Sequence, residues 1–160
     1  MNKIVDNETW LEARKAFLEV EKAFQKARDE FAARRRALPW RKTDIPYVFE
    51  TESGQQSLRD LFGDASQLIV YHFMFHPEWA AGCKSCSFWA DSYNGSVTHL
   101  RARDVALVAI SRAPLQLLLA YRERMGWDFP WASSATNSFN YDFGVSFSQK
   151  EINEGSADYN

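Results

Sequence analysis

Cysteine is scarce in this sequence, which contains only Cys83 and Cys86 among its 160 residues. A small secreted domain that depends on disulfide bridges would carry more cysteines, spread along the chain. Two cysteines separated by two residues are instead typical of an intracellular dithiol. The shortage therefore argues against a disulfide framework and directs attention to the one pair.

Long apolar runs and an excess of charge of one sign are also missing. The most apolar run, residues 68–75, is interrupted by His72 and is too short to span a bilayer. The first ten residues lack the apolar stretch of a signal peptide. A net charge of -2 gives no global basic surface of the kind that binds nucleic acid. We therefore expect a cytoplasmic protein that has neither membrane nor nucleic acid as a partner.

The chain is long enough for one domain with a substantial core, and too short for two. We expect an N-terminal helical extension over residues 1–40, a central domain over 41–148 and a polar tail over 149–160. The tail offers no side chains for a core, so we interpret it as mobile or as the point where a domain is interrupted.

The N-terminal extension has the pattern of one long amphipathic helix over about residues 8–37. Apolar residues recur there at alternating spacings of three and four: Trp10, Ala13, Phe17, Val20, Phe24, Ala27 and Phe31. The apolar stripe is narrow and aromatic. Packing against the central domain is the favoured interpretation, and a coiled coil with a second chain is the alternative.

The central domain alternates short strand and helix signals. We expect a strand over residues 47–49, a capped turn over 57–62, buried strands over 67–75 and 105–110, a helix over 114–125 and a further short strand over 129–134. Residues 139–145 are aromatic without a clear period. The two apolar strands are predicted to be buried on both faces of an α/β sheet, parallel to each other and joined by right-handed crossovers.

The segment of residues 76–89 joins the first buried strand to a helix that we expect to run to about Leu100. Its two cysteines then lie near the first turn of that helix. Free backbone N–H groups and the helix dipole stabilise a thiolate there, and Lys84 adds a positive charge nearby. Cys83 is the predicted nucleophile, and Cys86, one turn further, is the predicted resolving thiol.

Two other interpretations of the cysteine pair stay open. The pair could be half of a zinc site, whose remaining ligands would have to come from His72, His76 or His99, or it could be two inert core thiols. Because a buried strand precedes the pair, we favour redox chemistry over these two interpretations, and we expect no bound metal.

Four further residues are candidates for supporting roles. The second buried strand ends just before Arg112, which would place this side chain at the sheet edge near Cys83, either holding an anion or forming a surface salt bridge. Trp79 and Trp89 flank the cysteines and could wall a substrate groove or simply pack. His72 is expected to be a hydrogen-bonded core histidine rather than a proton shuttle.

The sequence resembles a bacterial thioredoxin-like family of predicted dithiol-disulfide oxidoreductases, formerly a domain of unknown function. The resemblance rests on the blocks LPW (38–40), YVF (47–49), LRDLFG (58–63), QLIVYHFMF (67–75), GC (82–83), CSFWAD (86–91), SRAP (111–114), RMGW (124–127), FPW (129–131) and FNYDFGV (139–145). It covers almost the whole chain. It implies a thioredoxin-like three-layer α/β fold behind the long N-terminal helix, and thiol redox chemistry.

The chain departs from that pattern in two places. Lys84 stands where members of the family often have proline, and residues between paired cysteines tune the reduction potential. A complete thioredoxin fold also continues into a hairpin and a last helix, with a cis-proline facing the dithiol, whereas the last proline here is Pro130. We therefore expect a domain that is incomplete at its C-terminus, or a sheet edge covered by a partner chain.

Dithiol–disulfide exchange is the favoured function, with a disulfide-containing substrate, an external thiol reductant and no bound cofactor. A thiol peroxidase is one alternative, although that class typically has threonine and proline where Ala80 and His76 stand here, three and seven residues before Cys83. The other alternative is a non-catalytic thioredoxin-like interaction module, a homodimer through its N-terminal helix or its open sheet edge.

Overall fold

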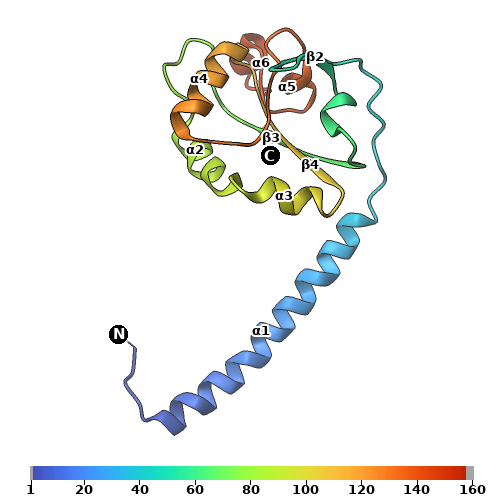
Figure 1. Cartoon of the computed structure of the whole chain (residues 1–160). Coiled ribbons are helices and arrows are strands. Elements are labelled where there is room, and N and C mark those ends of the chain that lie inside the picture. Colours follow the sequence, from blue (N-terminus) through green and yellow to red (C-terminus); the bar gives the residue numbers. More distant parts are fainter. Residues whose placement is uncertain (1, 158–160) are drawn as a thin grey trace. The chain divides into compact units, whose positions relative to one another are not determined.

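The computed structural model describes residues 2–157 (Figure 1). Its helices and strands, with η for a 3-10 turn, are α1 (Asn7–Arg36), β1 (Val48–Thr51), β2 (Gly54–Ser57), η1 (Asp60–Phe62), β3 (Gln67–His72), α2 (Lys84–Ala90), η2 (Asp91–Tyr93), α3 (Ser96–Arg101), β4 (Val105–Ser111), α4 (Leu115–Met125), β5 (Trp131–Ser133), α5 (Phe139–Asp142) and α6 (Gln149–Glu154). The chain forms two compact units that adjoin in sequence at Asp44 and Ile45.

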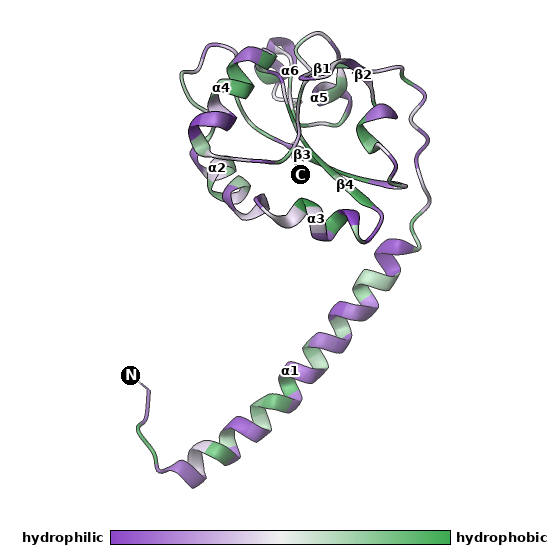
Figure 2. Ribbon diagram, viewed as in Figure 1, coloured by the Kyte–Doolittle hydropathy of each residue, from purple (hydrophilic) through white to green (hydrophobic). Residues whose placement is uncertain are grey.

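The first unit contains the predicted long helix, which is confirmed as α1. Asp6 caps it, because its carboxylate accepts hydrogen bonds from the Thr9 backbone N–H at 2.8 Å and from the Thr9 hydroxyl at 3.0 Å. None of its 30 residues is buried. Apolar residues alternate with hydrophilic ones along the whole helix (Figure 2). Its apolar stripe is therefore exposed.

The second unit is built on a five-stranded sheet with the order β2-β1-β5-β4-β3. Strands β3, β4 and β5 run parallel, whereas β1 is antiparallel to both of its neighbours. The predicted parallel pair is confirmed, with β3 and β4 in register from Gln67 opposite Val105 to His72 opposite Ile110. Strand β2 was not predicted, since its sequence, GQQS, has no apolar residue.

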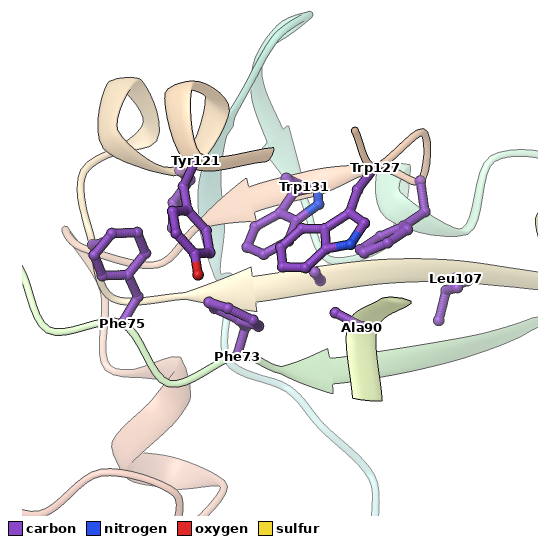
Figure 3. Close-up of a cluster of buried hydrophobic side chains, with 11 residues drawn as sticks. Phe73, Phe75, Ala90, Leu107, Tyr121, Trp127 and Trp131 are labelled. Atoms are coloured by element: carbon purple, nitrogen blue, oxygen red, sulfur yellow. The ribbon is translucent and has the colours of Figure 1, made fainter. Parts of the chain in front are cut away.

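The sheet separates two apolar clusters that draw alternate residues from β4. Leu107 and Ala109 belong to one cluster, and Val108 and Ile110 belong to the other. The predicted burial of this strand on both faces is therefore confirmed. The first cluster is largely aromatic, with the stacked rings of Trp127 and Trp131 close to Phe73 (Figure 3). The cysteine-bearing segment packs on this face.

Two predictions for this unit were wrong. Strand β3 is not buried on both faces, because it is the edge strand of the sheet and Ile69 is 45% exposed. The helix after the cysteines does not continue to Leu100, since it ends at Ala90 and the chain re-forms a helix only after Gly95, which has a positive φ of 75°.

Helices α5 and α6 lie in segments for which no helix was predicted. Helix α5 occupies part of the unassigned aromatic segment. Helix α6 lies within the predicted polar tail and begins with a capping box, in which Ser148 and Glu151 bond to each other's backbone N–H groups. The end of that predicted tail, residues 158–160, lies outside the described residues. None of the helices within residues 2–157 combines the length and apolar character needed to cross a bilayer.

Candidate active site

The loop after β3 fixes the backbone of the cysteine pair. Cys83 is the N-cap residue of α2, and its carbonyl oxygen accepts a hydrogen bond from the Ser87 N–H at 2.9 Å. The Cys83 N–H donates in turn to the carbonyl oxygen of Met74 at 2.9 Å. Met74 lies two residues beyond β3, so the start of α2 is tied directly to the end of the edge strand.

Gly82 allows this segment to lie against the aromatic core. A Cβ atom built on Gly82 would lie 2.6 Å from Cζ of Phe73 and 3.0 Å from Cε1 of Tyr121. Real Cβ atoms do not approach carbon this closely, and Phe73 is buried against Trp127 and Trp131. Only glycine fits the position that immediately precedes the first cysteine.

The Cys83 sulfur lies in an environment that favours the thiolate. Its pKa is lowered chiefly by a hydrogen bond from the Cys86 backbone N–H, with further bonds from the Cys86 side chain and the Ser85 N–H, while partial burial acts in the opposite direction. These N–H groups belong to the first turn of α2 and have no partner within the helix. The first turn of α2 therefore surrounds the Cys83 sulfur with donors that stabilise a thiolate.

The Cys86 sulfur is held in the protonated form. Burial is the largest cause of its raised pKa, and the neighbouring Cys83 thiolate raises it further. The Met74 N–H and the Tyr71 hydroxyl act against this, because both favour the ionised sulfur. The backbone N–H groups of α2 therefore favour the ionised form of Cys83, and burial favours the protonated form of Cys86. Both cysteines are free in this structure.

A pocket of ≈ 180 Å³ opens beside Cys86, at the carboxyl ends of β3 and β4. The lining includes four of the residues singled out from the sequence: His72, Trp79, Cys86 and Arg112. Asn140, from α5, lies on the same wall. The Arg112 guanidinium lies 4.5 Å from the centre of the Tyr141 ring, a cation–π contact. No carboxylate within residues 2–157 forms a salt bridge with Arg112, so the predicted salt bridge is not found there.

His72 does not have the hydrogen bonds expected of a core histidine. Its ring stacks on Phe139 with the ring centres 5.4 Å apart, and its Nδ1 is buried with no hydrogen-bond partner among the described residues. Burial lowers its pKa, so the ring is neutral at pH 7. The prediction was wrong on this point, because the aromatic residues that surround the ring come from α5, whose packing the sequence did not reveal.

The other two candidates lie away from the pocket wall. Lys84 is exposed, and Trp89 is 61% exposed with its ring against Phe88, which is more exposed still. Tyr71, Met74 and Asn140 were missed by sequence reasoning. Tyr71 offered a weak signal, since it shares the apolar strand with His72. Among the described residues, no group of three or more His, Cys, Asp and Glu is placed to hold a metal ion.

The chain belongs to a bacterial protein family of unknown function, DUF899, whose family model matches residues 1–160. Curated proteins give no match. Among solved structures, the chain is similar to Peroxidoxin BcpB from Mycobacterium tuberculosis, with a TM-score of 0.54, 18% identity, and 67% of this chain and 66% of that chain covered. It is also similar to a mutant of PrxQ from Xylella fastidiosa, with a TM-score of 0.51, 15% identity, and 71% and 73% covered.

These similarities confirm the thioredoxin-like α/β fold that the sequence blocks implied. The chain spans just under two thirds of the length of BcpB. Identities below 20% establish the fold and not the chemistry. The specific activity therefore has to be argued from the residues of the site.

Proposed function

We propose that this family member is a thiol–disulfide oxidoreductase in which Cys83 is the nucleophile and Cys86 the resolving thiol. The observation that carries the proposal is the placement of two sulfurs three residues apart: Cys83 is the N-cap residue of α2, and Cys86 packs against the buried core. This placement shifts their pKa values in opposite directions. A dithiol enzyme needs one ionised sulfur that attacks the substrate disulfide. The other sulfur has to stay protonated until the mixed disulfide has formed. The backbone N–H groups of α2 stabilise the ionised form of Cys83, and burial favours the protonated form of Cys86.

The first step is attack of the Cys83 thiolate on one sulfur of a substrate disulfide. The substrate S–S bond breaks, a Cys83–substrate S–S bond forms, and the other substrate sulfur leaves as a thiolate that takes a proton from solvent. The negative charge at Cys83 disappears in this step. Because that charge is one of the causes of the raised Cys86 pKa, its loss makes Cys86 easier to ionise when it is needed.

The second step is attack of Cys86 on the Cys83 sulfur. Cys86 gives its proton to solvent, the mixed disulfide breaks, and the rest of the substrate leaves as a thiolate. The enzyme is then left with a Cys83–Cys86 disulfide. An external thiol reductant supplies two electrons and two protons to restore the dithiol, so no bound cofactor takes part.

The pocket beside Cys86 is the proposed substrate site. Arg112 supplies a fixed positive charge and Trp79 an aromatic wall, so the arrangement suits a disulfide whose flanking groups are anionic or planar. His72 contributes a neutral polar edge to the same wall. We assign Lys84 and Trp89 to the exposed rim, where they would meet a larger substrate.

A thiol peroxidase is the second candidate, supported by the names of the two similar structures, a peroxidoxin and PrxQ. Here the Cys83 thiolate would attack a peroxide, the O–O bond would break, and Cys83 would become a sulfenic acid while an alcohol or water leaves. Cys86 would condense with it to the same disulfide and release water. Ala80 brings no hydroxyl group to bind the peroxide.

The test compares a model disulfide and a peroxide as oxidants of the reduced 160-residue chain. Disulfide exchange predicts rapid oxidation by the disulfide, complete loss of it in Cys83→Ser, and a trapped mixed disulfide, visible by mass spectrometry, in Cys86→Ser. Thr98→Ser, on the exposed side of α3, is the control variant. Rapid oxidation by peroxide alone would select the second candidate, and full activity in Cys83→Ser would eliminate both.

A further inference from the structure

The exposed stripe of α1 repeats every seven residues. Trp10, Phe17, Phe24 and Phe31 are spaced by seven, and Ala13, Val20 and Ala27 follow the first three of them by three residues each. The four aromatic side chains are 55–65% exposed. A sustained seven-residue repeat with apolar side chains at the first and fourth positions is the pattern by which two helices supercoil. A row of exposed aromatic side chains also marks an interaction surface.

We propose that α1 forms an antiparallel two-stranded coiled coil with α1 of a second copy of this chain. The size of the side chains is the first reason. The repeat places a large aromatic residue at the first position and a small residue, usually alanine, at the fourth. A helix of this kind fits a partner that offers small residues opposite its large ones.

Only the antiparallel arrangement pairs large with small residues along the central part of the helix. With full overlap, Phe17 lies opposite Ala27 of the second copy and Phe24 lies opposite Val20. By the same register, Phe31 meets Ala13. A parallel pair would instead put each aromatic residue against its own counterpart and each small residue against its own counterpart. Overpacked aromatic layers would then alternate with underpacked layers of small residues.

The charges at the two ends of α1 are the second reason. Asp6, Glu8 and Glu12 lie at its start, and three consecutive arginines, Arg34 to Arg36, end it. An antiparallel pair brings the acidic start of each helix to the arginines of the other and opposes the two helix dipoles favourably. A parallel pair would place six arginines together at one end.

Arg34 also completes the repeat in the antiparallel register. It occupies the fourth position of the last repeat, opposite Trp10 of the second copy, where a guanidinium can stack on the indole ring. The chain already contains such a contact within α1, with Arg28 5.9 Å from the centre of the Phe24 ring. Beside the stripe, Arg14 and Glu21 form an ion pair at 2.9 Å within one helix.

The stripe is large enough for a stable dimer. A buried aromatic side chain removes about 150–250 Å² from water. Because these side chains are 55–65% exposed before association, four from each copy together supply on the order of 1,000 Å², about the area that a specific interface must clear. The aromatic residues should therefore dominate the association energy.

The first test is sedimentation equilibrium of the 160-residue chain. We expect a dimer, and at least a tenfold weaker association in a Phe17→Glu, Phe24→Glu double variant. The matched control is Leu11→Glu, Leu18→Glu, which adds the same charges next to these positions but about 130° from the centre of the stripe. Near-ultraviolet circular dichroism of the buried tryptophans checks that the second unit remains folded. A monomeric wild type, or equal weakening by both double variants, would overturn the proposal.

The second test measures orientation. In a Cys83→Ser, Cys86→Ser background, a spin label on Asn7→Cys gives one label at the start of each helix. The antiparallel register places Asn7 level with Ala37 of the second copy, so the two labels should lie roughly 45 Å apart. A parallel pair would hold them within roughly 20 Å, and that distance would refute the proposed orientation.

Discussion

The hydroxyl group of Tyr71 in β3 donates a hydrogen bond of 3.0 Å to the main-chain carbonyl oxygen of Cys86. The edge strand of the sheet thereby holds the first turn of the helix that carries both thiols. Burial and the neighbouring cysteine raise the pKa of Tyr71, so the phenol remains a neutral donor over the range in which the thiols titrate. The strand therefore influences both the position and the acidity of Cys86.

Tyr71→Phe should weaken the resolving step more than the attack. Without the hydroxyl, the ionised form of Cys86 loses one source of support, so its pKa should rise further and the mixed disulfide at Cys83 should persist longer. Loss of one hydrogen bond should also reduce the free energy of unfolding by about 0.5–1.5 kcal/mol. Rapid-quench mass spectrometry and urea unfolding measure the two effects. An unchanged lifetime of the mixed disulfide would contradict the role given to Tyr71.

The two thiols should react with iodoacetamide at different pH values. Only the thiolate is alkylated, and the backbone N–H groups lower the pKa of Cys83 while burial raises that of Cys86. Alkylation of Cys83 in a Cys86→Ser variant should therefore have its midpoint below the ordinary value of about 8.5, and that of Cys86 in Cys83→Ser above it. The reverse order would exchange their roles in the proposed mechanism.

Gly82→Ala should destabilise the second unit by about 1–3 kcal/mol, because the added methyl group overlaps the Phe73 ring. Phe73→Leu shortens the overlapping side chain at the cost of a cavity. The loss in the double variant should therefore be smaller than the sum of the two single losses, and urea unfolding of all three variants gives the coupling free energy. Strict additivity would show that the close approach of Gly82 to Phe73 is not what requires glycine.

The salt bridge between Arg122 and Glu52 should contribute stability only above acidic pH. Arg122 donates two hydrogen bonds, at 2.5 and 2.8 Å, to the Glu52 carboxylate, and these lower the pKa of Glu52 below its ordinary value of 4.5. A lowered pKa means that the contribution is present above that value and is lost as the pH falls through the folded-state pKa. Since Glu52 is half exposed, Arg122→Met should cost at most about 1 kcal/mol at pH 7, less at high salt, and nothing at about pH 2. The matched variant Arg124→Met should show no such pH dependence of the unfolding free energy.

Arg112→Ala should raise the KM for anionic disulfides more than for neutral ones, with kcat little changed, because the guanidinium is proposed to bind the substrate and not to react with it. Steady-state kinetics with a matched pair of charged and neutral aromatic disulfides measures the difference. Arg124→Ala is the control, since Arg124 lies near Tyr121 and away from the pocket. Equal changes in KM for both substrates would mean that Arg112 does not distinguish charged from neutral disulfides.

Sequence reasoning was sufficient for those parts of the protein whose signal is carried by neighbours in the chain. The apolar run of β4, the repeat of α1 and the turn at Gly126 each follow from the spacing or the conformational freedom of residues close in sequence. The position of Cys83 at a helix start was predictable for the same reason. Strand β3 was found by the same signal, but its place at the sheet edge was not.

Other properties depend on distant residues meeting, and these required the folded structure. The raised pKa of Cys86 depends on burial, His72 lost its expected hydrogen bonds to ring stacking on Phe139, and the pocket joins Arg112 to Asn140. Each of these three properties arises from contacts between segments that lie far apart in the sequence. Burial and hydrogen bonding act through space, so the causes of the raised Cys86 pKa could not be read along the chain until the fold had placed β3 beside the two cysteines.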